Sequence, residues 1–132
     1  MRNNLTILDN QLTITSKQLC DIINMFREED NSTPKEHKTL MRDIRAELEA
    51  LANAGIEGQH NFVPSSYINS QGKEQPCYNI TKAGAMSILN KESAVVRYRT
   101  QLYIDTLEKQ LMAQMLPSNN NNNLIGINPY SN

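Results

Sequence analysis

Basic side chains recur between residues 35 and 45 at spacings that suit one side of a helix. At about 100° per residue, a helical projection gathers an apolar set on one face: Leu40, Ile44, Leu48 and Leu51. The opposite face carries a mainly basic set: Lys35, Lys38, Thr39, Arg42 and Arg45. Lysine and arginine bind DNA phosphates, and arginine can also bind guanine edges through two hydrogen bonds. The pattern therefore predicts a helix that binds in a DNA groove, although a solvated surface helix shows the same periodicity.

Individual positions on this helix have different expected roles. Arg42 lies at the centre of the basic face and is the first candidate for a base or phosphate contact. Arg45 lies toward its edge, where a surface ion pair with Glu49 is the alternative. His37 projects at the edge of the apolar face, which favours a partly buried histidine over a phosphate contact. Asp43 lies on the flank, where it could orient an arginine, bond to a neighbouring hairpin or be solvated.

The residues that enzymes and metal sites require are not grouped along the chain. His37 and His60 have no cysteine or acidic partner at metal-ligand spacing, and the five glycines are scattered instead of forming a phosphate-binding loop. Cys20 and Cys77 fit buried apolar positions and form no disulfide framework. We therefore expect a protein without catalytic activity, cofactor or metal.

Composition sets the size of the protein and limits its overall charge. The 132 residues suffice for one domain, and 13 basic against 14 acidic residues give a net charge of −1. No overall basic field favours nucleic acid, so local patches matter more, including the acidic run at 28–30. The sequence shows no signal peptide and no 18-residue apolar run, and a cytoplasmic location is expected.

Several elements must position the basic helix. Two short strands are predicted around a turn at Asp9–Asn10. A helix capped by Thr15 or Ser16 follows and runs to about Glu28. After a polar turn, Pro34 marks the start of the basic helix, which runs to about Asn53. Two helices joined in this way predict a helix-turn-helix. Residues 62–69 and 75–80 then predict a β-hairpin, the wing of a winged helix-turn-helix, with Gln71 and Lys73 at a tip that suits DNA backbone or water.

The C-terminal part of the chain is predicted to be helical and then irregular. Thr81 caps a short helix to about Asn90, and a long helix follows over 93–116. Its second half could pair with a second copy of the chain or fold back on its own core. The Asn-rich residues 117–132 read as a flexible tail or linker, so residues 1–116 are the predicted domain.

Three stretches carry a resemblance to a known family. They are residues 36–45 (EHKTLMRDIR), residues 66–82 (SYINSQGKEQPCYNITK) and residues 99–107, centred on Tyr103-Ile104. In order and spacing they resemble the phage regulatory protein Rha family, whose N-terminal domain also occurs in phage antirepressors. The family's helix motif corresponds here to His37, Leu40, Arg42, Asp43, Ile44 and Arg45. The long acidic turn at 27–33 departs from the shorter, more neutral turn expected.

The resemblance implies a phage or prophage regulator with a winged-helix-like DNA-binding domain and no enzymatic activity. Together with the pattern, it predicts an α+β winged helix-turn-helix protein with a small N-terminal hairpin, a wing and a long C-terminal helix. The expected partner is double-stranded DNA, bound through Lys35, Lys38, Thr39, Arg42, Arg45, Gln71 and Lys73. A homodimer through 93–116 would set the half-site spacing. The alternative is an antirepressor or inhibitor that binds a host or phage protein such as a repressor.

Overall fold

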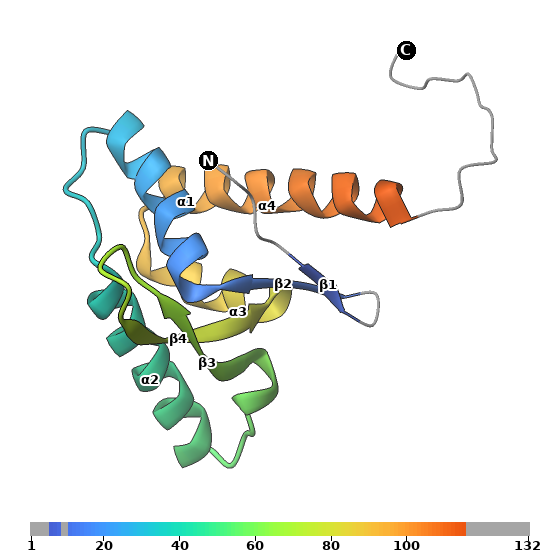
Figure 1. Cartoon of the computed structure of the whole chain (residues 1–132). Coiled ribbons are helices and arrows are strands. Elements are labelled where there is room, and N and C mark those ends of the chain that lie inside the picture. The colour runs from blue at the N-terminus through green and yellow to red at the C-terminus, as the bar shows by residue number, and fades with distance from the viewer. Residues whose placement is uncertain (1–5, 9–10, 116–132) are drawn as a thin grey trace.

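Two antiparallel hairpins join into a single four-stranded sheet with the order β1–β2–β4–β3 (Figure 1). The strands are β1 (Thr6–Leu8), β2 (Gln11–Thr15), β3 (Phe62–Ile68) and β4 (Glu74–Thr81). The structure, a computed structural model, describes residues 6–8 and 11–115. The predicted N-terminal hairpin forms from β1 and β2, and it joins the larger sheet because Ile14 of β2 pairs with Ile80 of β4. Hydrogen bonding across β2 and β4 thus ties the start of the chain to the second hairpin.

Four helices accompany the sheet, and the two threonine caps predicted from the sequence are present. The helices are α1 (Ser16–Glu29), α2 (His37–Asn53), α3 (Lys82–Ile88) and α4 (Ala94–Met115), with short 3₁₀ turns at Gln59–Asn61 and Leu89–Lys91. Thr15 accepts a hydrogen bond from the backbone of Gln18, whose side chain bonds back to Thr15, so α1 begins with a capping box. Thr81 caps α3 by accepting from the Gly84 backbone. The α+β class is therefore confirmed.

The predicted start of α2 at Pro34 is wrong by about one turn. The helix begins at His37, and Glu36 before it has extended backbone angles. Two bonds hold residue 35 out of the helix: its backbone N–H donates to Asn24 Oδ1 at 2.7 Å, and its carbonyl accepts from Asn24 Nδ2 at 2.8 Å. Arg27 donates to the Thr33 carbonyl in the same way. Tertiary hydrogen bonds from α1 thus outweigh the local helix preference of a proline.

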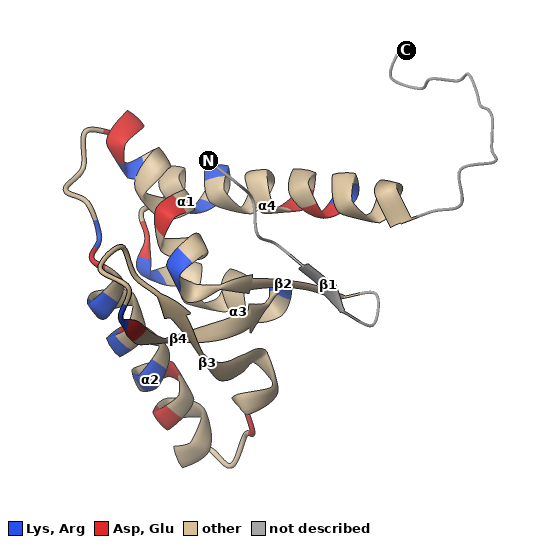
Figure 2. Ribbon diagram, viewed as in Figure 1, with Lys and Arg blue, Asp and Glu red and all other residues tan. Residues whose placement is uncertain are grey.

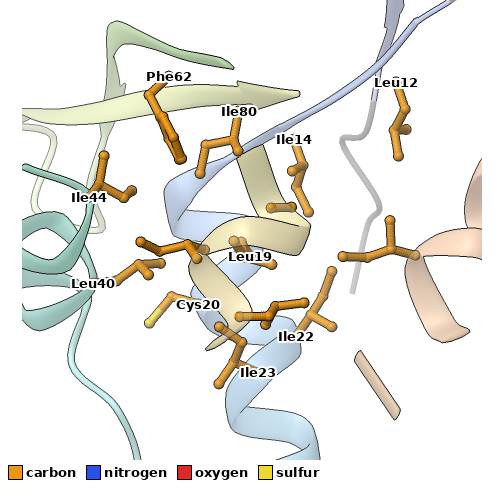
Figure 3. Packing of buried hydrophobic residues seen from close by; sticks show 14 of the residues in the cluster. Leu12, Ile14, Leu19, Cys20, Ile22, Ile23, Leu40, Ile44, Phe62 and Ile80 are labelled. Carbon is orange, nitrogen blue, oxygen red and sulfur yellow. The ribbon is translucent and has the colours of Figure 1, made fainter. Parts of the chain in front are cut away.

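One hydrophobic core connects α1, α2, the sheet and α4. Figure 3 shows Leu19, Ile22 and Ile23 of α1 in one cluster with side chains from α2 and the sheet. The most deeply buried large side chains are Phe62, Leu12, Ile14, Leu19, Ile23, Leu40, Ile44, Ile80, Ile88, Leu89, Ile104 and Val96. Because both Leu40 and Ile44 of α2 lie in this set, the predicted apolar face of α2 is confirmed, and its opposite face is directed away from the core.

α4 packs along one side and leaves the other side uncovered. Val96, Thr100, Ile104 and Leu107 are buried. Val95, Tyr98 and Leu102, spaced three and four residues apart, remain 45%, 66% and 54% exposed. Apolar side chains therefore lie on two sides of this helix, one buried and one exposed. The Asn-rich segment 117–132 and the predicted domain boundary at 116 lie outside the described residues. None of the helices within 11–115 has the length and apolar character needed to cross a lipid bilayer.

Candidate nucleic-acid interface

The outer face of α2 presents three basic side chains to solvent. Lys38, Arg42 and Arg45 are all exposed, and Figure 2 shows the concentration of basic residues along α2. Lys38 is 80% exposed and lies 3.7 Å from Glu36, which is 69% exposed, so the contact contributes little in water. Arg42 and Arg45 form no ion pair within residues 11–115, and Arg45 does not pair with Glu49. These cations are therefore available to an external anion.

The acidic residues of α2 that flank this face are directed inward. Asp43 accepts from Lys35 Nζ at 2.9 Å, and Glu47 accepts a hydrogen bond from Ser87 of α3. Neither carboxylate therefore needs a cation from the outer face of α2. The helix carries three acids and three cations: Asp43 and Glu47 are bound to other parts of the protein, whereas Glu49 and all three cations are exposed. The separation gives α2 a basic surface in a chain whose net charge is −1.

Lys35 is not on the basic face of α2, which corrects its predicted position. It precedes the helix, its side chain is only 6% exposed, and its Nζ lies 3.0 Å from Glu92 Oε2. Glu92 also accepts from Arg27 Nε at 2.8 Å and Nη2 at 3.1 Å. Burial alone would raise the pKa of Glu92, but the hydrogen bonds from Arg27 and Lys35 outweigh burial and hold that pKa below its usual value. Lys35 is thus part of a buried ion network that ties the turn before α2 to the start of α4.

The tip of the β3–β4 hairpin is rigidly built and polar. The Asn69 side chain accepts from the backbone N–H groups of Gln71 and Lys73, both at 2.9 Å. Gly72 has a φ of 78°, which only glycine adopts without strain. Gln71 and Lys73 are both exposed. The structure therefore places these two predicted site residues on a defined turn, where they face solvent.

A groove of about 470 Å³ runs between α2 and this hairpin, and here it is called the α2–hairpin groove. Its walls are Glu36, which precedes α2, then His37, Lys38, Met41 and Arg45 from α2, and Tyr67, Gln75 and Pro76 from the hairpin. Two of the predicted site residues, Lys38 and Arg45, thus share one concave surface with side chains of the hairpin. Sequence reasoning missed Gln75 and Tyr67, because nothing in a linear pattern shows which strand residues face a helix.

His37 joins the wall of the groove to the interior. Its Nε2 lies 2.9 Å from the hydroxyl of fully buried Ser16, and its ring meets Tyr67 edge-on with centroids 5.7 Å apart. The Ser16 hydroxyl also accepts from the Tyr78 N–H at 3.0 Å and lies 3.6 Å from Met41 Sδ. Burial, and then the nearby Lys17 charge, lower the pKa of His37. The partly buried histidine expected from the sequence is therefore confirmed.

Thr39 and the two cysteines do not line the α2–hairpin groove. Thr39 is half-buried and lies on α2, three residues before Arg42. Cys20 and Cys77 are both buried, and burial raises the pKa of each thiol, as it does for an unreactive apolar cysteine. Within the described residues, no three histidine, cysteine or acidic side chains approach closely enough to hold a metal ion.

Comparison with known proteins gives one match. The sequence profile of the family described as phage regulatory protein Rha matches residues 31–109, which include α2, the hairpin and most of α4. No curated protein matches the chain. No solved structure matches it either.

Proposed function

Because the chain belongs to the phage regulatory protein Rha family, which suggests a phage regulatory role, we propose that it regulates transcription by binding double-stranded DNA through α2 and the β3–β4 hairpin. One observation carries the proposal. Lys38, Arg42 and Arg45 are exposed without strong internal partners, while Asp43 and Glu47 on the same helix are bound inside the protein. This arrangement leaves a basic surface of the kind that phosphates require.

The order and pairing of the elements support a winged helix-turn-helix. β2 leads into α1 and α2, the hairpin follows, and β4 returns to pair with β2. In this arrangement α2 takes the place of the recognition helix and the hairpin that of the wing. The turn at residues 30–36 exceeds the usual three or four residues, but Asn24 and Arg27 fix its end to α1.

The proposed contacts follow from where each side chain lies. The N-terminal part of a recognition helix contacts base edges, which assigns that role to Thr39 and Arg42. Arg42 is best suited to it because its guanidinium forms no ion pair within residues 11–115 and can bind guanine through two hydrogen bonds. Arg45 and the tip residues Gln71 and Lys73 would bind phosphates. We leave Lys35 out of the DNA contacts because its ammonium group is already bound to Glu92 and Asp43.

The test is DNA affinity as a function of salt, with Arg42→Ala as the variant. We expect weaker binding of a duplex and a log–log salt slope lower by about one unit if Arg42 contacts a phosphate. If Arg42 reads a base instead, the same variant should lose sequence discrimination. Arg99→Ala is the control, since this exposed arginine lies on α4 and pairs with Glu29. Unchanged affinity and unchanged discrimination in Arg42→Ala would remove α2 from the interface.

A second copy of the chain is the proposed occupant of the exposed stripe on α4. Within residues 11–115, one copy offers Lys38, Arg42, Arg45 and Lys73 as exposed cations on the proposed DNA side, so two copies would double the phosphate contacts. Helix-turn-helix proteins commonly bind paired half-sites as dimers. Leu102→Glu should turn a dimer into a monomer in sedimentation analysis and weaken DNA binding. A wild-type protein that sediments as a monomer at high concentration contradicts this arrangement.

The acidic end of α1 supports a second candidate, an antirepressor that binds another protein. Glu28 and Asp30 are exposed and form no ion pair within residues 11–115, and Figure 2 shows this acidic end of α1. Acids at a helix C-terminus are electrostatically unfavourable, so a basic segment of a partner protein would relieve them. Co-purification with a repressor, lost in Glu28→Gln/Asp30→Asn, without affinity for duplex DNA at low salt selects this candidate.

A further inference from the structure

The α2–hairpin groove combines cations, a histidine and hydrogen-bonding side chains on a surface that the basic face of α2 only borders. Lys38 and Arg45 lie on its helix side, Gln75 and Tyr67 on its hairpin side, and His37 and Met41 between them. Arg42 does not line it. The groove is therefore separate from the part of α2 that carries Arg42, the residue proposed to contact bases.

The hydrogen bonds of Ser16 leave one ring nitrogen of His37 unused inside the protein. The Ser16 hydroxyl accepts from the Tyr78 N–H, so its single proton is free to bond to His37 Nε2. A neutral His37 with Nε2 as the acceptor carries its own proton on Nδ1. Nδ1 has no partner among residues 11–115, and the ring forms part of the groove wall. The neutral ring thus has an N–H group free for a ligand.

The same hydroxyl also accommodates a protonated ring. When Nε2 carries a proton it donates to Ser16, whose own proton can turn toward Met41 Sδ at 3.6 Å. The buried side of His37 therefore stays hydrogen-bonded in both charge states. An anion in the groove would favour the charged form, which adds a third positive charge beside Lys38 and Arg45.

We propose that the α2–hairpin groove receives a phosphodiester segment of double-stranded DNA, with Lys38 and Arg45 neutralising its phosphate and His37 donating a hydrogen bond to it. The proposal rests on the DNA-binding function proposed above. It adds a site for a DNA backbone phosphate, at which binding is linked to the protonation of His37. Glu36 is the one acid in the groove wall, and its contact with Lys38 at 3.7 Å would compete with the phosphate.

The ionisable and polar groups that surround His37 belong to three elements. Lys17 and Asp21 come from α1, Lys38 and Arg45 come from α2 with Glu36 just before it, and Tyr67 and Gln75 come from the hairpin. In the free protein, burial and Lys17 keep the pKa of His37 below its ordinary value of 6.5. A bound phosphate should raise that pKa, so the complex takes up a proton and affinity increases as pH falls.

The first test measures affinity for a mixed-sequence duplex of about 24 base pairs, roughly two helical turns, by fluorescence anisotropy. Lys38→Gln and Arg45→Gln should each weaken binding about tenfold at about 50 mM salt and lower the salt slope by about one unit. Glu36→Gln should tighten binding, a gain that unfolding cannot produce. Lys109→Gln, at an exposed position on α4, is the matched control and should bind as the wild type does.

The second test follows the ring signals of the two histidines by NMR, free and with the same duplex. The His37 signal should titrate at higher pH in the complex than in the free protein. The signal of His60, which lies outside the groove, is the internal control. His37→Gln should remove the increase in affinity at low pH, and His60→Gln should retain it.

The outcomes separate this inference from the function on which it rests. If the duplex binds and Arg42→Ala weakens it, but Glu36→Gln, Lys38→Gln and Arg45→Gln bind as the wild type does, the backbone does not enter the groove. The inference is then overturned while the proposed function stands. If the wild-type protein binds no duplex even at low salt, the proposed function itself fails.

Discussion

Lys35 and Lys38 are three positions apart in the sequence, yet they occupy opposite environments. The side chain of Lys35 is 6% exposed and bonds to Glu92 and Asp43, whereas that of Lys38 is 80% exposed with only a loose contact to Glu36. One lysine connects the turn before α2 to α4, and the other lies on the free surface of α2. The comparison shows that a basic residue next to α2 can belong to the support of that helix instead of its exposed basic face.

The buried network and the exposed face also respond differently to solvent. The network of Arg27, Lys35, Asp43 and Glu92 is largely shielded from water, so removing one member leaves charges that are costly to bury. The exposed cations of α2 have water as their partner and contribute little to folding. Mutations in the first region should therefore change stability, and mutations in the second should change binding alone.

The largest effect is expected from Glu92→Gln. The amide keeps the size of the side chain but removes the negative charge that Arg27 and Lys35 share, so we expect a loss of about 3 kcal/mol in the free energy of unfolding. Urea denaturation measures it. The control is Glu29→Gln, which breaks the exposed pair with Arg99 and should cost at most about 0.5 kcal/mol. Equal small losses in both variants would show that the network does not hold the turn.

Low pH should reduce the stabilisation that Glu92 gives to the folded protein. The pKa of Glu92 in the folded protein lies below its ordinary value of 4.5, so below that pH the unfolded chain binds a proton that the folded chain resists. The stabilising effect is complete above pH 4.5 and is lost as pH falls through the folded-state pKa. The stability difference between wild type and Glu92→Gln should shrink in acid. A difference that stays constant from neutral pH down to acid contradicts this assignment.

The two lysines themselves provide a direct comparison of smaller size. Lys35→Gln should destabilise the protein by about 2 kcal/mol because Glu92 and Asp43 lose a buried partner. Lys38→Gln should leave stability unchanged within about 0.5 kcal/mol. Thermal melting measures both. Similar melting temperatures for the two variants would show that Lys35 contributes no more to folding than the exposed Lys38 does.

The smallest effect is expected at the hairpin tip. Lys73 is exposed and bonds only through its backbone, so Lys73→Gln should not alter folding. In duplex binding it should lower the salt slope by at most about one unit, since the tip offers a single phosphate contact. Binding titrations at several salt concentrations detect the change. A larger loss than that of Arg42→Ala would shift the centre of the interface from α2 to the hairpin.

Much of the fold follows from local patterns in the sequence. Thr15 and Thr81 begin their helices because a hydroxyl satisfies a free N–H wherever the next residues are helical. Leu40 and Ile44 are buried as their spacing predicts, and the turn at 69–73 forms where small polar residues and glycine occur together. Arg42 is exposed for the same reason, since it lies opposite that apolar face.

Other features depend on residues that are distant in the sequence, and only the tertiary structure decided them. Pro34 does not begin α2, because Asn24 and Arg27 on α1 hold residues 33–35 in an extended path. Lys35 is withdrawn from the basic face because Glu92, 57 residues later, offers a charged partner that is itself buried.

The α2–hairpin groove likewise exists only where β3 and β4 are placed beside α2, so no periodicity in the chain could reveal it. The sequence by itself determined the helices, the turns and an exposed arginine at position 42, because these depend on neighbours within a few residues. Packing decided which cations remain free and where a backbone phosphate could bind, because burial and ion pairing are set by contacts between distant elements.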